Sequence, residues 1–376
     1  MWKKIIVSML VIVALMVGLL GASYYYVKGK IYKDVADSQV EKSISSDVLE
    51  EDDDQVTYKE VDGITNVLLI GTDKRADLDG CRSDSMIIAT LDNNNKKIKL
   101  TSLYRDALVY IPGHGEDKMN AAFELGGVKL LFQTIKKNYD IDINDYVVID
   151  FSGFETVIDQ LGGVEVNVKD YQLEELNKYI GESTGGNDCP VKKAGKQVLN
   201  GKQALAYARI RYGVGDDYER TERQREVVLK MAEKLKDTNP TKYFGIMSAM
   251  LDYLTTNIDP LEALNMAYTI YNFPTLNSEQ ISIPILDITE DMNYKDLGSV
   301  LVSDMDQNAE ILNKFIYDDE MPNEKSYDYE SLYDKIAEYQ AENDSYKSYG
   351  SAEDNLGDYS NDINSNKNEN EVQLWD

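Results

Sequence analysis

The feature that most constrains the fold of this 376-residue chain is the alternation of short apolar runs with amphipathic ones between Asn66 and Ile285. NVLLIGTD and KIKLTSLY are short, apolar and bounded by turn residues, which predicts buried strands. ERTERQREVVLKMAEKL repeats apolar residues at helical spacing, which predicts an amphipathic helix. Alternating strands and helices predict a three-layer α/β domain, in which a mixed central sheet is flanked by helices on both faces.

The N-terminal segment predicts a membrane anchor. Two lysines precede an uncharged, mostly apolar run from Ile5 to Val27, and about 20 such residues span a bilayer as one helix. The alternative is a cleaved signal peptide, but its apolar core is usually only about 7–15 residues long, and LLGASYYY is a poor cleavage site. We therefore favour one uncleaved transmembrane helix in a single-pass protein of the cell membrane, with the bulk of the chain extracellular.

The negative charge of the chain lies largely in the polar segments before and after the predicted folded domain. The formal net charge is -28, which disfavours nucleic acid as a partner. The last 60 residues hold 17 acids against four lysines, a composition typical of disorder, with a brief helix around DYESLYDKIAEYQ. The predicted organisation is a short cytoplasmic N-terminus at 1–4, a transmembrane anchor at 5–27, an acidic linker at 28–62, a folded extracellular domain at 63–316 and an acidic disordered tail at 317–376.

Arginine is concentrated in one stretch. The chain has 31 lysines but eight arginines, and five of these lie between Tyr207 and Glu226. A guanidinium group is a flat fork that grips phosphate or carboxylate with two hydrogen bonds and keeps its charge when buried. The stretch therefore suggests an anion site. The alternative is that these arginines pair with the many acids around them.

A loop between two predicted strands, GTDKRADLDGCRSDS from Gly71 to Ser85, interleaves carboxylates with cations. Mg²⁺ takes hard oxygen ligands, usually one or two carboxylates completed by phosphates and water. Arginines beside those carboxylates could hold the remaining phosphate oxygens. An exposed loop of mixed charge would have the same composition, so this loop alone does not decide between the two.

Further signals lie near the ends of predicted elements. Arg105 and Asp106 follow a strand, and Lys118 precedes a helix. Arg209 and Arg211 lie two residues apart, so their side chains converge only if the helix that carries Arg209 ends near residue 208. The glycines at 213 and 215 favour an end about there.

The chain contains six motifs in this order: NVLLIGTDKR, CRSDSMIIATLD, LTSLYRDALVYIP, KMNAAFELGG, DYVVIDFSGFETVIDQLGGVEVNV and LNGKQALAYARIRYGVGDDYERTERQREVV. Together they resemble the LytR-CpsA-Psr family of cell-wall phosphotransferases. They cover roughly Asn66 to Lys236, and an anchor before the domain is also usual in the family. The resemblance implies a catalytic domain at 63–316. It also implies transfer of a glycan from a polyprenyl-pyrophosphate carrier to peptidoglycan, with Mg²⁺ as cofactor or Mn²⁺ in its place.

The resemblance also implies roles for individual residues. Asp73 and Asp84 become metal ligands. The residues implied to grip the pyrophosphate, or to support that grip, are Arg75, Arg82, Arg105, Lys118, Arg209, Arg211, Arg220 and Gln224, with Asp106 and Asp217 as further supporting positions. The candidate catalytic residues are Arg105, Asp106 and Asp84, and either carboxylate could accept the proton of an attacking hydroxyl. The chain departs from the family pattern at Tyr104, where a proline is usual.

These features predict a membrane-anchored phosphotransferase that attaches teichoic acid, capsule or a similar polymer to the cell wall. Two rival functions would use the same residues. One is a polyprenyl-pyrophosphate binding module without turnover, and the other is a pyrophosphate hydrolase with water as the acceptor. The expected partners are the lipid-linked glycan, peptidoglycan and the lipid bilayer.

The chain has two cysteines, Cys81 and Cys189, and one histidine. Outside the cell a pair of cysteines is more often bonded than free, so we predict a disulfide between them. Two unpaired thiols are an alternative, whereas a two-cysteine zinc site lacks ligands because His114 is alone. We expect His114 in a surface loop. The apolar stretch FELGGVKLLFQTI could line a tunnel for a lipid tail or belong to an ordinary core helix.

Overall fold

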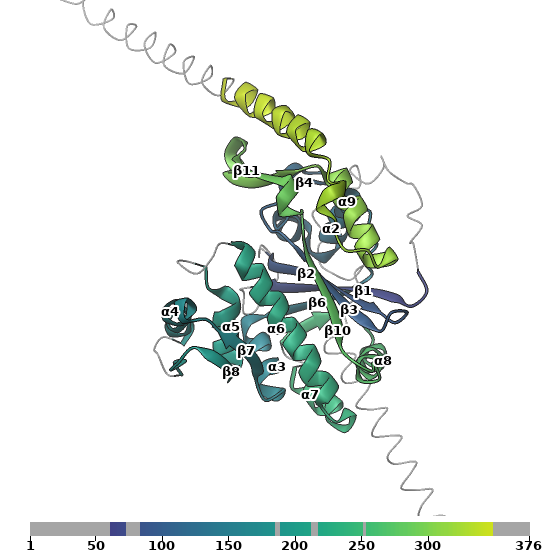
Figure 1. Cartoon of the computed structure of the whole chain (residues 1–376), viewed down its shortest axis with the longest axis vertical. Helices are drawn as coiled ribbons and strands as arrows, with labels where there is room; N and C mark the ends of the chain where they lie inside the picture. The colour runs from purple at the N-terminus through teal and green to yellow at the C-terminus, as the bar shows by residue number, and fades with distance from the viewer. Residues whose placement is uncertain (1–60, 73–82, 185–188, 212–216, 251–252, 349–376) are drawn as a thin grey trace, which may run out of the picture.

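The computed structural model describes most of the chain between residues 61 and 348, namely residues 61–72, 83–184, 189–211, 217–250 and 253–348 (Figure 1). The predicted membrane anchor lies outside these ranges and stays a prediction. Among the helices that are described, none combines the length and the apolar character that crossing a bilayer requires.

A six-stranded mixed sheet forms the centre of the fold (Figure 1). Two neighbouring pairs, β1 with β6 and β10 with β3, are parallel, and the other three pairs are antiparallel. This confirms the mixed α/β class that the alternating sequence pattern predicts. From edge to edge the strands are β10 (Asn277–Ile283), β3 (Lys97–Leu103), β2 (Ser83–Asp92), β1 (Ile64–Thr72), β6 (Asp145–Asp150) and β9 (Leu254–Thr256).

Helices pack against both faces of this sheet because successive side chains of a strand point in opposite directions. In β1, Leu68 and Ile70 lie in a hydrophobic cluster with α2 (Ala121–Tyr139) and α9 (Met305–Asn313). Leu69, between them, packs on the opposite face in a cluster with α6 (Asp217–Asp237) and α8 (Pro260–Tyr271). α7 (Tyr243–Met250) follows α6 and packs against α3 (Phe151–Gln160).

The apolar stretch FELGGVKLLFQTI belongs to the core helix α2. Leu130, Leu131 and Ile135 are buried in the cluster that covers the sheet. Gly126 and Gly127 interrupt the helix with non-helical backbone angles, and Gly127 takes a φ of 61° that glycine adopts readily. This burial matches the core-helix alternative, and the stretch lines neither of the two cavities that meet at Asp84.

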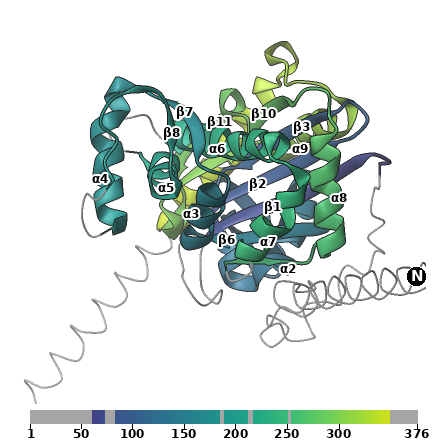
Figure 2. The ribbon, with the colours of Figure 1, turned by 90° about the horizontal axis from the view of Figure 1, so that it is seen from below.

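A smaller lobe lies beside the sheet, where α4, α5, β7 and β8 group together in Figure 2. Its own hydrophobic cluster joins Ile158, Val166, Leu176 and Val227. The run GVEVNV forms the predicted strand, but that strand pairs with β8 and not with the central sheet. The lobe consists of α3 (Phe151–Gln160), β7 (Val164–Val168), α4 (Leu173–Thr184), β8 (Gly195–Leu199) and α5 (Gly201–Arg209).

Two short antiparallel pairs of strands lie away from this lobe, across the central sheet (Figure 1). One is β4 (Leu108–Ile111) with β5 (Gly115–Lys118), and exposed His114 lies in the turn between them, as expected. The other is β11 (Thr289–Asn293) with β12 (Ser299–Ser303). We refer to residues 289–303 as the β11–β12 hairpin.

The segment after residue 316 corrects the predicted start of the disordered tail, because residues 317–348 are described and include a helix at 329–348 (Figure 1). We call this helix the C-terminal helix. Its Leu332 is 5% exposed and joins the main core, and its Tyr339 packs edge-on against Tyr294 with ring centroids 5.3 Å apart. Acidic composition predicted a disordered tail with a brief helix around DYESLYDKIAEYQ. The helix is confirmed and extends to residue 348, and Leu332, Ile336 and Tyr339 recur at helical spacing and bury one of its faces.

Candidate active site

Asp84 lies in a β-bulge near the start of β2. Ser83 and Ser85 oppose Thr72 and Gly71 of β1, and Asp84 between them has no partner in the ladder. A bulge bends the strand and re-aims the extra side chain. The Asp84 side chain is 39% exposed, and its Oδ1 accepts a hydrogen bond from Arg105 Nη1 at 3.3 Å.

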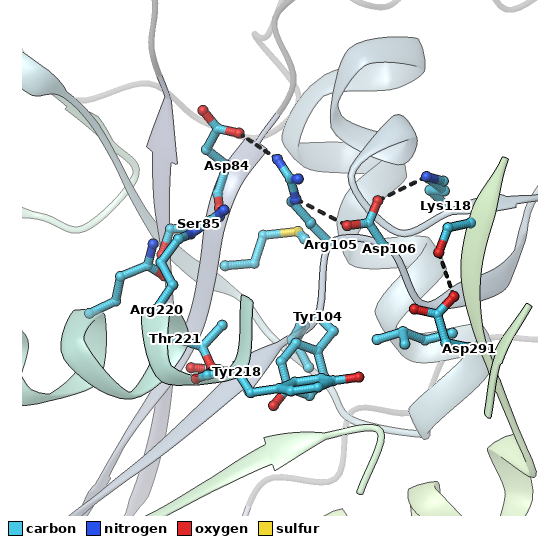
Figure 3. A pocket seen from close by; sticks show the side chains of 16 residues that line it. Asp84, Ser85, Tyr104, Arg105, Asp106, Lys118, Tyr218, Arg220, Thr221 and Asp291 are labelled. Carbon is cyan, nitrogen blue, oxygen red and sulfur yellow. Dashed lines mark hydrogen bonds and ion pairs between the residues drawn. The ribbon is translucent and has the colours of Figure 1, made fainter. Parts of the chain in front are cut away.

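Arg105, Asp106 and Lys118 extend this contact into a row of alternating charges (Figure 3). Arg105 Nε donates to Asp106 Oδ2 at 3.1 Å, and Lys118 Nζ donates to Asp106 Oδ1 at 3.0 Å. Each charged group is therefore held by the next one. We call Asp84, Arg105, Asp106 and Lys118 the charged row. Such mutual contacts hold the four charged groups in fixed positions without a ligand.

The backbone that carries the charged row is fixed from two sides. The N–H of Asn120, at the start of α2, donates to the carbonyl oxygen of Arg105 at 3.1 Å. The N–H of Leu301, in β12, donates to the carbonyl oxygen of Asp106 at 2.9 Å. The second contact lies in a region without a recognisable motif, so sequence reasoning gave no sign of it.

Helix α6 contributes Arg220 and Gln224 from one face, because residues four apart lie one turn apart. Arg220 is 4% exposed, and its Nη2 donates to the carbonyl oxygen of Asp84 at 2.7 Å. Ser85 Oγ donates to Gln224 Oε1 at 2.9 Å. These two bonds attach α6 to the bulge.

Two of the five clustered arginines have structural roles, which corrects part of the sequence argument. Arg223 is buried and donates from Nη2 to the carbonyl oxygen of Ile210 at 2.6 Å. Arg225 is also buried, and its Nη1 donates to Ser102 Oγ at 2.7 Å and to Ser282 Oγ at 2.6 Å. Burial lowers the pKa of Arg225. The high local count of arginine thus overstates the number of groups that can face an anion.

Arg209 and Arg211 lie at the other side of the site. Helix α5 ends at Arg209, and Ile210 leaves the helix with φ -59° and ψ 139°, close to the end that the sequence predicts. The Arg209 guanidinium lies 4.4 Å from the ring centroid of Phe151, a distance typical of a cation–π contact. The two arginines line the same cavity.

Two cavities meet at the bulge. They share the side chains of Asp84, Ser85, Arg105, Arg220 and Gln224, which we call the shared wall. The polar cavity, of about 420 Å³, extends from this wall toward Asp106, Lys118, Asp291 and Ser299 (Figure 3). The apolar cavity, of about 440 Å³, contains Arg209 and Arg211 and is otherwise lined mainly by Leu69, Ile87, Val147, Phe154, Leu205, Val228 and Met231.

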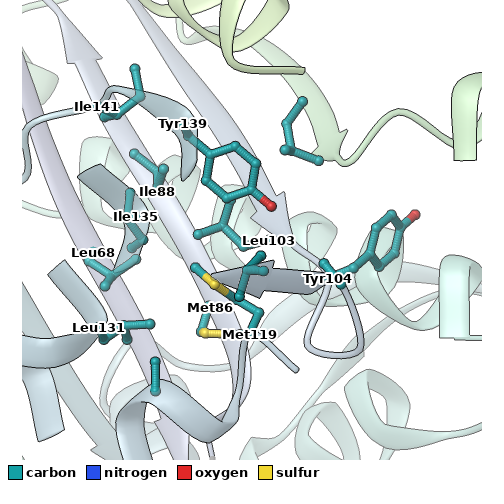
Figure 4. Packing of buried hydrophobic residues seen from close by; sticks show 14 of the residues in the cluster. Leu68, Met86, Ile88, Leu103, Tyr104, Met119, Leu131, Ile135, Tyr139 and Ile141 are labelled. Carbon is teal, nitrogen blue, oxygen red and sulfur yellow. The ribbon is translucent and has the colours of Figure 1, made fainter. Parts of the chain in front are cut away.

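Tyr104, which stands where the family usually has proline, connects the end of β3 to α6. The side chain is 4% exposed and belongs to the core cluster drawn in Figure 4, together with Leu103 and Met86. Its ring meets that of Tyr218 edge-on, with centroids 5.4 Å apart. The tyrosine therefore fills a packing role immediately before Arg105 in the sequence.

Several predicted site residues lie outside the described part of the chain, namely Asp73, Arg75, Cys81 and Arg82. Within the described ranges, no three His, Cys, Asp or Glu side chains gather as a metal site. A hard cation that also binds phosphate needs few carboxylates, and half-exposed Asp84 in the shared wall suits that requirement. Cys189 forms no disulfide with any residue that is described, so its bond to Cys81 stays a prediction.

This site defines an α/β protein in which arginines and a carboxylate stand between a polar and an apolar cavity, an arrangement suited to an amphiphilic phosphate. The chain belongs to the LytR-CpsA-Psr family, because the family model described as "LytR_cpsA_psr family" matches residues 24–315. The match ends before the C-terminal helix.

Named relatives within the family include a regulator and a transferase. The chain is 33% identical over 261 residues to "Regulatory protein MsrR" of Staphylococcus aureus (strain Mu50), which covers 69% of this chain and 76% of the relative. It is 35% identical over 210 residues to the "Polyisoprenyl-teichoic acid--peptidoglycan teichoic acid transferase TagU" of Enterococcus faecalis, covering 54% of this chain and 65% of that protein.

Solved structures share the fold. "TagT bound to LI-WTA" aligns with a TM-score of 0.57 and 29% identity, covering 70% of this chain and 94% of that one. "LytR-CPS2A-psr family protein YwtF (TagT) with bound octaprenyl pyrophosphate lipid" aligns with a TM-score of 0.53 and 27% identity, covering 69% and 94%. Distant relatives of this chain are thus named as teichoic acid transferases, and one was solved with a polyprenyl pyrophosphate.

Proposed function

We propose that this protein is a membrane-anchored phosphotransferase that moves a glycan phosphate from a polyprenyl-pyrophosphate carrier to peptidoglycan outside the cell. The observation that carries the proposal is the junction of an apolar cavity with a charged, arginine-containing wall. A polyprenyl pyrophosphate is an amphiphile that needs both surfaces. The names of TagU and TagT support the same activity.

The apolar cavity would take the start of the polyprenyl chain. Its aliphatic and aromatic lining removes hydrocarbon from water, a transfer worth about 25 cal/mol for each Å² of apolar surface, from which the entropy cost of binding is subtracted. Arg209 and Arg211 lie in the same cavity as Arg220 and Arg105. Guanidinium groups in these positions would hold the pyrophosphate oxygens with charge-assisted hydrogen bonds.

The reaction follows from placing the phosphates at the shared wall. An acceptor hydroxyl oxygen attacks the sugar-linked phosphorus, the anhydride bond breaks, and polyprenyl phosphate leaves with the bonding electrons. The hydroxyl proton passes to a carboxylate, for which Asp106 and Asp84 are the candidates. Arg105, between these two carboxylates, would neutralise charge that develops on the phosphate oxygens.

We propose Mg²⁺ as the cofactor, held by Asp84 and, in the region outside the described residues, by Asp73. Bound there, the ion would supply Lewis-acid stabilisation of the phosphate oxygens. Removing divalent cations with EDTA should abolish transfer by the purified protein, and adding back Mg²⁺ should restore it.

The test begins with the lipid that co-purifies with the detergent-extracted protein, read by mass spectrometry. The purified protein is then given a polyprenyl-pyrophosphate-linked glycan and peptidoglycan, and Asp84→Asn is compared with wild type. We expect wild type to form glycan-linked peptidoglycan, and the variant to keep the lipid but lose turnover by about 100-fold or more.

The rival functions give different products in the same assay. A binding module forms no product in wild type or variant. A pyrophosphate hydrolase releases glycan phosphate into solution without linking it to peptidoglycan. Either result would reject the transferase function.

A further inference from the structure

We propose that the β11–β12 hairpin forms a saccharide-binding subsite of the polar cavity, in which Asp291 and Ser299 bind sugar hydroxyl groups. The inference rests on the proposed function, because it concerns the glycan or acceptor of that reaction. Neither residue lies in a motif of the family resemblance.

The geometry places a polar pair opposite the phosphate-binding groups. Asp291 and Ser299 line the same cavity as Arg105 and Lys118, and the Ser299 hydroxyl donates to Asp291 Oδ1 (Figure 3). Both hairpin residues are exposed. The cavity therefore has Arg105 and Arg220 in the shared wall, and a carboxylate–hydroxyl pair at its other end, the far wall, where Lys118, already bonded to Asp106, is the neighbouring cation.

The charge of the far wall selects the class of ligand. A carboxylate repels phosphate, and among the described residues no lysine or arginine is paired with Asp291 to offset its charge. A carboxylate instead accepts hydrogen bonds from hydroxyl groups, and a serine hydroxyl both donates and accepts. This wall therefore fits a neutral group that is rich in hydroxyls. The saccharide attached to the reacting phosphate is such a group, and so is the sugar whose hydroxyl attacks that phosphate.

The hairpin is held firmly enough to serve as a binding wall. Leu301 N–H is bonded to the carbonyl oxygen of Asp106, so β12 is attached directly to the charged row. On its outer side, Asn343 of the C-terminal helix donates from Nδ2 to the carbonyl oxygen of Asn293 at 2.9 Å and accepts from the N–H of Lys295 at 2.8 Å. Binding groups that are fixed before the ligand arrives lose less entropy on binding.

The strand also provides a matched control. Glu290 precedes Asp291 in β11 and is likewise exposed, but side chains of consecutive strand residues point to opposite faces. Glu290 does not line the polar cavity. Glu290→Ala and Asp291→Ala therefore remove the same charge from opposite sides of one strand.

Equilibrium binding to the full chain in detergent tests the subsite without requiring turnover. Three probes are used: a sugar-free polyprenyl pyrophosphate, the same lipid carrying a disaccharide, and a soluble peptidoglycan disaccharide-peptide. We expect Asp291→Ala to weaken binding of a sugar-containing probe by about 10-fold or more, the loss typical of a hydrogen bond to a charged group. Ser299→Ala should weaken binding of the same probe by a smaller factor, and Glu290→Ala should leave the binding of all three probes unchanged.

The probe whose binding is weakened by Asp291→Ala identifies the source of the sugar. If only the lipid-linked disaccharide binds more weakly, the subsite belongs to the donor glycan. If the soluble fragment binds more weakly, the subsite belongs to the acceptor. Equal weakening of the sugar-free lipid, or equal behaviour of Asp291→Ala and Glu290→Ala, would overturn the subsite. A protein that binds these probes as expected but forms no linked product would refute the transferase and leave the subsite standing.

Discussion

At the scale of single residues, the site depends on side chains that fix one another. Arg105 bridges Asp84 and Asp106, and Arg220 holds the backbone of Asp84. Arg105, Asp106, Lys118 and Arg209 stand out in the sequence because each lies near the end of a strand or helix, where polar side chains of this fold class gather. The roles of Arg220 and Gln224, within α6, were implied by the family resemblance alone. The structural roles of Arg223 and Arg225 could not be predicted, because their burial and the partners of Arg225 from β3 and β10 depend on tertiary packing.

Replacing Arg105 with lysine tests whether transfer requires its planar guanidinium group. Lysine keeps the charge but cannot bridge two carboxylates with a planar group, so Arg105→Lys should lower kcat for transfer by about 100-fold. Its Tm should stay close to that of wild type, because the side chain is partly exposed. Arg225→Lys is the contrasting variant: it should lower Tm while its remaining folded fraction keeps most activity. Near-normal kcat in Arg105→Lys would contradict the bidentate role.

A second residue-scale prediction concerns Asp145 at the start of β6. Burial, with repulsion from Glu262, raises the pKa of Asp145 from 3.8 to about 6. Because the folded-state pKa is the higher one, folding favours the protonated form. Stability should therefore fall as the pH rises from about 4 to about 6, and the loss should persist above that range.

The variant Asp145→Asn removes this ionisation. It should raise the free energy of unfolding by about 1 kcal/mol at pH 7.5, after allowance for solvent screening, and by almost nothing at pH 4. Urea unfolding at the two pH values measures the difference. Glu262→Gln should give a smaller change of the same sign, and a gain of equal size at both pH values would contradict the assignment.

At the scale of elements, the local sequence pattern predicted which residues form strands and helices, but not which strands pair with each other. The run at Val164–Val168 has clear alternation and forms a strand, yet alternation does not say which strand it pairs with, and it pairs with β8. The β11–β12 hairpin was missed because TEDMN is polar and short. The C-terminal helix was underestimated because its acidic residues hid a narrow apolar face.

Removing the C-terminal helix should destabilise the domain. A chain that ends at Asp328 loses the burial of Leu332 and the contacts of Tyr339 and Asn343 with the hairpin. Truncating a buried leucine alone typically costs about 2–5 kcal/mol, so we expect Tm to fall by about 5 °C or more. A chain that ends at Ser348 keeps these contacts and is the matched control. Equal Tm values for the two chains would show that the helix contributes no stability.

At the scale of the whole molecule, the fold brings together residues that are far apart in the sequence. Arg105 follows β3, Arg220 comes from α6, and the hairpin arrives from the last part of the domain. The family resemblance predicted that the first two act at one site. It could not predict the hairpin or the C-terminal helix, since its motifs end near Lys236 and both elements lie beyond them.

The shared wall has a consequence for the order of events in a two-substrate reaction. Since the polar and apolar cavities are separate spaces that meet at Asp84 and Arg105, a lipid in one leaves room for an acceptor in the other. Direct attack then needs no covalent enzyme intermediate, so the reaction should pass through a ternary complex and not a ping-pong cycle. Initial rates measured at several fixed acceptor concentrations should give intersecting double-reciprocal lines, whereas parallel lines, or a phosphorylated enzyme trapped without acceptor, would mean that the two substrates are never bound together.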